Sequence, residues 1–196
     1  SLQDILANGA DLSFNAITVD SDTSTRDSLM LFATGQAKND KAAPLDDFKE
    51  KLYDLLIDLA CQVVRDGEGA SKFISVNVTG ADTNVAAKRI GFAIANSPLV
   101  KTAVAGEDPN WGRIIMAIGK TYEKIKPQKV NIYFGKILVV RNGLEQVSVS
   151  NGALKKYLKK ENILIKISLG LGKAKYDIQT CDFSHGYVDI NASYKS

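Results

Sequence analysis

A run of apolar residues at helical spacing is the strongest constraint on the fold of this chain. The run consists of Leu45, Phe48, Leu52, Leu55, Leu56, Leu59 and Val63. This spacing predicts a long amphipathic helix. We expect the helix to end at Asp66-Gly67. Residues 73–79 then alternate between apolar and polar side chains, which predicts a strand buried on one face. The sequence therefore indicates an α/β fold in which helices cover a sheet.

Weaker local signals divide the rest of the chain into shorter elements. We expect further helices over residues 1–12, 29–37 and 152–160, and one that Asp82 or Thr83 caps and that ends before Pro98. We expect further strands over residues 14–19, 130–134, 137–140, 163–169 and 187–190. The pair Asn142-Gly143 is the strongest hairpin signal in the chain. Because the composition changes after Lys120, we predict a core portion at residues 1–121 and a smaller α+β domain at residues 122–196.

The composition excludes several classes of protein. A chain of 196 residues can bury a substantial core, and no apolar run is long enough to span a bilayer. The lysine-rich residues 155–160 lack interleaved aromatic side chains, so no nucleic-acid site is expected. Cys61 and Cys181 lack ligand spacing and residues 1–14 lack a signal peptide, which indicates reduced thiols in a cytoplasmic protein. Because His185 is the single histidine, we expect neither a histidine-based metal site nor a histidine-centred triad.

The most informative stretch is Gly-Glu-Asp-Pro-Asn-Trp-Gly-Arg, at residues 106–113. Pro109 and Asn110 predict a turn, with an apolar segment before it and a helix-like segment after it. Polar groups at such a junction between elements often belong to a binding site. The alternative is a purely structural turn, in which Trp111 enters the core and Arg113 pairs with one of the two acids.

This stretch resembles the signature of the ornithine acetyltransferase (glutamate N-acetyltransferase) family, in its C-terminal or beta chain. Four further blocks, in the family's order, extend the resemblance over nearly the whole chain. They lie at residues 13–25, 65–70, 94–102 and 181–192. Together these blocks identify the chain as a member of this family.

The resemblance implies a fold, a reaction and a partner. The fold is α/β, a layered sandwich of helices over mixed β-sheets like that of N-terminal-nucleophile aminopeptidases, with the smaller C-terminal α+β unit. The reaction is acetyl transfer from N2-acetylornithine to glutamate in arginine biosynthesis, through an acetyl-threonine intermediate on a self-cleaved enzyme. Some members also use acetyl-CoA as the donor, and the route needs no metal or organic cofactor. The partner is the alpha chain of the same precursor, in an alpha2beta2 heterotetramer.

In the family, the nucleophile is the threonine that begins the beta chain, and its own α-amine acts as the base. A strand follows this threonine and a helix comes next, whereas Ser1 leads directly into the expected helix. We therefore expect no catalytic nucleophile within this chain and place the threonine upstream of Ser1. The oxyanion hole is expected on the alpha chain.

Three positions match the family's substrate-binding residues, namely Glu107, Asn191 and Ser196. The carboxylate of Glu107 can hold a substrate ammonium through a charge-assisted hydrogen bond. The amide of Asn191 offers donors and an acceptor, which suits an amino acid. Ser196, the last residue, adds a hydroxyl group. We expect Glu107 and Asn191 to converge on one amino-acid pocket.

Three other functions stay open from the residues alone. A related N-terminal-nucleophile aminopeptidase or amidase would use water instead of glutamate as the acyl acceptor. Asp20 and Asp22 follow an apolar segment, as in magnesium phosphatases of the haloacid dehalogenase type, although side-chain turns explain them as well. A chain without its nucleophile could also serve only as a binding partner. The family usually has glycine at Ser21 and asparagine at Arg26, so the geometry of this loop stays open.

Overall fold

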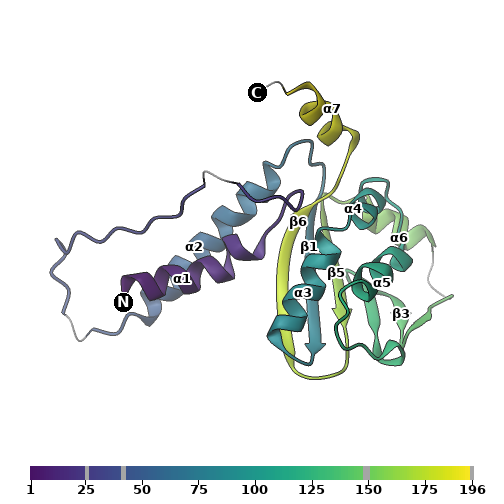
Figure 1. Cartoon of the computed structure of the whole chain (residues 1–196), viewed down its shortest axis with the longest axis horizontal. Helices are drawn as coiled ribbons and strands as arrows, with labels where there is room; N and C mark the ends of the chain where they lie inside the picture. Colours follow the sequence, from purple (N-terminus) through teal and green to yellow (C-terminus); the bar gives the residue numbers. More distant parts are fainter. Residues whose placement is uncertain (25–26, 41–42, 148–150, 195–196) are drawn as a thin grey trace.

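One mixed sheet of six strands organises the computed structural model, which describes residues 1–24, 27–40, 43–147 and 151–194 (Figure 1). The strands are β1 (Phe73–Ala81), β2 (Asn131–Phe134), β3 (Ile137–Arg141), β4 (Leu144–Glu145), β5 (Asn162–Ser168) and β6 (Ala174–Cys181). They lie in the order β4-β3-β2-β5-β1-β6. Within this sheet β1 and β5 run parallel, and the other neighbouring strands run antiparallel. The α/β fold class expected from the sequence is confirmed.

Helices lie both against this sheet and away from it (Figure 1). They are α1 (Leu2–Leu12), α2 (Asp46–Arg65), α3 (Asn84–Ala95), α4 (Pro98–Ala105), α5 (Trp111–Gly119), α6 (Asn151–Leu158) and α7 (His185–Ser193), with 3-10 turns at Phe14–Ala16 and Pro127–Lys129. Helices α1 and α2 lie side by side and project away from the sheet, and α7 lies beyond the end of β6 (Figure 1). None of the helices in the described part of the chain combines the length and hydrophobicity that a membrane span requires.

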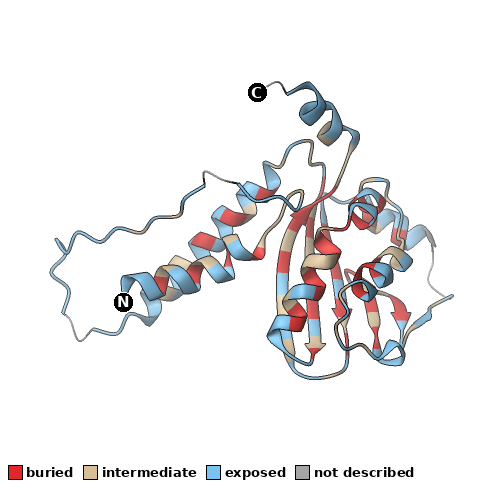
Figure 2. Cartoon of the chain, viewed as in Figure 1, coloured by how far each residue is buried: buried red, intermediate tan, exposed pale blue. Residues whose placement is uncertain are grey.

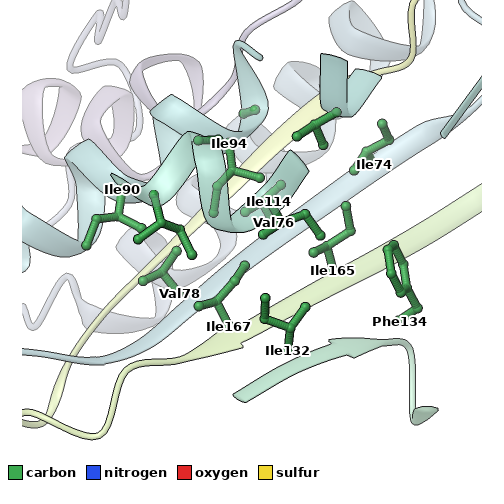
Figure 3. Packing of buried hydrophobic residues seen from close by; sticks show 14 of the residues in the cluster. Ile74, Val76, Val78, Ile90, Ile94, Ile114, Ile132, Phe134, Ile165 and Ile167 are labelled. Carbon is green, nitrogen blue, oxygen red and sulfur yellow. The ribbon is translucent and has the colours of Figure 1, made fainter. Parts of the chain in front are cut away.

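The hydrophobic core lies between the sheet and the helices that follow β1. Alternate residues of β1 are buried, as the sequence pattern predicts, and they face isoleucines of α3 (Figure 3). The best-buried members of this layer are Ile74, Val76, Val78, Ile90, Ile94, Ile165 and Ile167. Buried residues gather on the sheet, on the helix surfaces turned toward it and on α1 and α2, whereas α7 has none (Figure 2). The core therefore fixes the sheet and α3–α5 but does not extend to α7.

Several local predictions from the sequence are confirmed. Helix α2 ends at Arg65 with Asp66 as its C-cap, and the Thr83 side chain caps α3 by accepting from the Ala86 N–H. Asn142 and Gly143 form the turn between β3 and β4 with φ angles of 52° and 79°. Positive φ at both central residues is what a two-residue hairpin of type I′ requires.

Three predicted elements are wrong. Residues 29–37 form no helix, and Met30 and Phe32 are largely exposed, so this stretch lacks the packing that stabilises a short helix. Residues 14–19 form a 3-10 turn followed by an isolated bridge from Ile17 to Gln179, rather than a strand. The predicted strand at residues 187–190 is part of helix α7, which the Ser184 hydroxyl caps by accepting from the Gly186 N–H.

The predicted boundary between residues 1–121 and 122–196 passes through a shared sheet. β1 comes from the first stretch, and both of its neighbours, β5 and β6, come from the second. The division into two domains stays a prediction, because a sheet shared in this way links the two stretches by backbone hydrogen bonds.

We expect Ile165→Ala to destabilise the fold by about 2–5 kcal/mol, because it leaves a cavity at a fully buried position in the centre of the sheet. Chemical denaturation measured by circular dichroism checks this value. Val85→Ala is the matched control, since Val85 is 59% exposed on α3 and should change stability by only about 0.5 kcal/mol. Equal effects of the two changes would contradict the assigned core.

Candidate functional site

Residues 106–110 form a tightly bonded turn between α4 and α5, as predicted, and residues 111–113 begin α5. The Asp108 N–H donates to the Ala103 carbonyl at 2.8 Å, and the Asn110 side chain caps α5 by accepting from the Arg113 N–H at 3.2 Å. Glu107 adopts a φ of 57°, in the left-handed region of backbone conformation that is unfavourable for residues other than glycine. The stretch therefore has a structural reason for its unusual composition.

The charged side chains of this turn have partners other than those expected. Arg113 does not pair with Glu107 or Asp108 but donates to the Leu99 carbonyl at 2.7 Å. The Glu107 carboxylate lies 3.5 Å from the ammonium of Lys72, which is 9% exposed and also donates to the Leu158 carbonyl. Because a nearly buried ammonium is costly without a counter-charge, Glu107 stabilises Lys72 in this chain. The prediction that Glu107 also binds substrate stays a prediction.

Asn191 meets a different carboxylate. It lies in α7, where its Nδ2 donates to Glu68 Oε2 at 2.8 Å and to the Tyr187 carbonyl at 3.0 Å. Glu68 belongs to the loop between α2 and β1, and both members of the pair are exposed. Sequence reasoning did not select Glu68, although it lies in a family-like block at residues 65–70. Ser196, the third predicted site residue, lies outside the described residues.

An open pocket of about 520 Å³ lies between the end of α4 and the start of α7. It is lined by Thr102, Ala105, Gly106, Phe183, Ser184, His185, Tyr187 and Val188. Gly106 directly precedes Glu107, and the Tyr187 carbonyl is bonded to Asn191, so the two predicted residues adjoin this pocket without lining it.

Tyr187 also joins α7 to the acidic loop at residues 20–22. Its hydroxyl donates to Asp20 Oδ2 at 3.0 Å, and burial, followed by this hydrogen bond, raises the pKa of Tyr187. Asp20 Oδ1 accepts from the Asp22 N–H, and Ser21, where the family usually has glycine, adopts a φ of 81°. The loop is therefore a side-chain turn, and it lacks the preceding strand on which the phosphatase arrangement depends. Within the described ranges, no three His, Cys, Asp or Glu residues are grouped to hold a metal ion.

Comparison with known proteins gives one consistent result. A sequence model of the ArgJ family matches residues 1–196. The chain is 49% identical over its whole length to "Arginine biosynthesis bifunctional protein ArgJ" of Rhizobium meliloti and 50% identical to the protein of that name in Ruegeria pomeroyi. It covers 49% and 48% of those two proteins, so the chain spans about half the length of the curated relatives it matches.

A solved structure has the same fold. The crystal structure of the arginine biosynthesis bifunctional protein ArgJ from Bacillus halodurans superposes with a TM-score of 0.93 at 37% sequence identity. The match covers 98% of this chain and 92% of the chain in that structure.

We expect Gly69→Ala to loosen the contact between the Glu68 loop and α7. A Cβ at Gly69 would lie 2.2 Å from the Tyr187 nitrogen and 2.4 Å from the Gly186 carbonyl carbon, which are backbone atoms that cannot rotate away. The change should lower the thermal unfolding temperature and increase hydrogen exchange in α7.

Gly35→Ala is the matched control. The φ of Gly35 is 72°, close to the 67° of Gly69, but an added Cβ at Gly35 would meet nothing within 4 Å. The control therefore carries only the backbone strain of about 1–2 kcal/mol. Similar unfolding temperatures for the two variants would show that Gly69 is not held against α7.

Proposed function

Because the chain belongs to the ArgJ family, we propose that it is one half of an enzyme that transfers an acetyl group from N2-acetylornithine to glutamate. The match of the family model to residues 1–196 is the observation that carries this proposal. The names of the relatives support a role in arginine biosynthesis, and we propose that this role is carried out in the cytoplasm. The phosphatase alternative has no comparable support, since Asp20 belongs to a side-chain turn, and the family match does not favour the amidase.

The other half of the enzyme is proposed to be the alpha chain of the same precursor. The chain covers about half of its curated relatives, yet it matches most of one solved chain of the family, which favours a two-chain form. We place the nucleophilic threonine upstream of Ser1 and the oxyanion hole on the alpha chain, in an alpha2beta2 assembly. This chain then contributes groups that bind and orient the amino acids.

The reaction consists of two acyl transfers at one hydroxyl group. The threonine oxygen attacks the acetyl carbonyl carbon of N2-acetylornithine while the threonine α-amine takes the hydroxyl proton. The α-ammonium returns this proton to the leaving nitrogen as the carbon–nitrogen bond breaks, so ornithine leaves with a neutral 2-amine and an acetyl ester remains on the threonine. The neutral amine of glutamate then attacks this ester, which releases N-acetylglutamate and restores the hydroxyl. Members of the family that use acetyl-CoA form the same ester from the thioester.

The pair of Glu68 and Asn191 is suited to bind a substrate ammonium. Both amide hydrogens of Asn191 are donated within the chain, so its side chain offers a ligand the Oδ1 acceptor beside the Glu68 carboxylate. An ammonium has three donors and no acceptor, so two adjacent acceptors, one of them charged, suit it. N2-acetylornithine carries such a group on its side chain. Glu107 remains the second candidate for this role, and Ser196 adds a hydroxyl at the terminus.

We expect the co-expressed two-chain enzyme to release ornithine from N2-acetylornithine only when glutamate is present. Glutamate is the acceptor that regenerates the hydroxyl, so without it release should stop after one acetyl group per active site. Chromatographic measurement of free ornithine over time checks this. Sustained release of ornithine without glutamate would instead identify a hydrolase. No release of ornithine, with or without glutamate, would favour a binding role for this chain.

We expect Glu68→Gln to lower kcat/KM for N2-acetylornithine about ten- to a hundredfold, because it removes the charge from a hydrogen bond to the ammonium. Steady-state kinetics on the full-length, assembled enzyme check this.

Glu107→Gln is the matched comparison, since it removes the same charge from the carboxylate that faces Lys72. A loss confined to Glu107→Gln would place the ammonium site at the α4–α5 junction and reject the Glu68 assignment. Activity within about twofold in both variants would remove both carboxylates from the substrate site.

A further inference from the structure

Hydrogen bonds, and not buried side chains of its own, hold helix α7. None of its residues is buried, and its apolar side chains Val188 and Ile190 are 61% and 44% exposed. Residues 180–184, which we call the stem, form the end of β6 and the segment that leads from it to α7, away from the sheet (Figure 1). A helix without a buried face is not positioned by hydrophobic packing. The position of Asn191 therefore depends on how residues 180–184 are anchored.

Lys101 anchors this stem from the side of α4. Its ammonium donates to Thr180 Oγ1 at 2.9 Å and to the Cys181 carbonyl, and it lies 4.5 Å from the centre of the Phe183 ring. The Lys101 carbonyl accepts from the Phe183 N–H at 3.4 Å. The residue is 1% exposed, and this burial lowers the pKa of Lys101. One buried side chain thus contacts three of the four residues from Thr180 to Phe183, all but Asp182.

A chain of contacts leads from Lys101 to the proposed binding pair. The Phe183 ring stacks on Tyr187 with the ring centres 4.7 Å apart. The Tyr187 carbonyl accepts from Asn191, whose Nδ2 also donates to Glu68. Displacement of Phe183 would therefore be passed to Asn191 through a single turn of helix.

Asp182 anchors the other member of the pair. Its Oδ1 accepts from the N–H groups of Ser71 and Lys72, both at 2.8 Å, and its Oδ2 accepts from the Ser71 hydroxyl. The carboxylate is 1% exposed. These hydrogen bonds tie the stem of α7 to the segment that carries Glu68, and charge-assisted bonds to a buried carboxylate are strong. Ser184 adds a bond from its hydroxyl to the Gly69 carbonyl.

We propose that Lys101 and Asp182 are positioning residues for substrate binding: Lys101 sets the place of Asn191 through Phe183 and Tyr187, and Asp182 holds the Glu68 segment against it. This inference rests on the proposed function. A purely structural role makes a different prediction, because a loss of stability alone lowers the amount of folded enzyme and leaves the KM of the folded fraction unchanged.

The test compares Lys101→Met with Asn191→Ala in the full-length, assembled enzyme. Lys101→Met should raise KM for N2-acetylornithine about tenfold while kcat changes less than about threefold, as loss of ground-state positioning requires. In the Asn191→Ala background, Lys101→Met should add less than about twofold, because its effect on activity passes through Asn191. Lys88→Met is the matched control. Lys88 is on α3, away from α7, and its ammonium lies over the ring of Tyr176 on β6.

Two further variants keep the test decisive if Lys101→Met does not fold. Phe183→Leu removes the stacked ring but keeps an apolar side chain, and Asp182→Asn keeps the acceptor Oδ1 but removes the charge; both should raise KM in the same way. An unchanged KM in folded variants, while Asn191→Ala raises it, would overturn the positioning role alone. Full additivity of Lys101→Met or Phe183→Leu with Asn191→Ala would also overturn it. An unchanged KM in Asn191→Ala would instead reject the binding pair and, with it, the positioning role, whereas the proposed acetyl transfer is decided separately by glutamate-dependent release of ornithine.

Discussion

The antiparallel pairing of β1 with β6 is the constraint on which the candidate site depends. Phe73, at the start of β1, lies opposite Cys181, at the end of β6. The chain that enters β1 and the chain that leaves β6 must therefore meet at the same end of the sheet. Glu68 comes shortly before β1 and Asn191 shortly after β6, so two side chains 123 positions apart in sequence become hydrogen-bonded neighbours. Register, rather than local sequence, creates the pair.

This end of the sheet is held by a different kind of interaction from its face. On the face, the isoleucines and valines of β1, β5 and α3 exclude water and stabilise the sheet without directional bonds. At the end, Lys101 and Asp182 are buried polar groups whose hydrogen bonds fix particular backbone atoms. Because an unsatisfied buried polar group costs free energy, such bonds specify one arrangement of the chain. The apolar face thus provides stability, and the polar end provides position.

The parts of the fold that were predictable are those whose signal lies within a few residues. The alternation in β1, the Thr83 cap and the Asn142-Gly143 turn are local, and the structure has each of them. The prediction failed where a short apolar stretch could be either a helix or a strand, as at residues 187–190, or lacked a packing partner, as around Phe32. Asn191 could be predicted from resemblance, whereas its pairing with Glu68 could not, since no pattern in one sequence reports strand register.

The stretch at residues 106–113 is the most distinctive in the sequence, yet its residue types follow from the turn that it forms. Asn110 caps α5, and the backbone bond from Asp108 to Ala103 holds Glu107 in a strained conformation. That conformation directs the Glu107 carboxylate to Lys72, whose own N–H donates to Asp182. Lys72 therefore links the turn between α4 and α5 to the anchored start of α7. Glu107 therefore supports the same buried end of the sheet that positions Glu68 and Asn191, through Lys72 and Asp182.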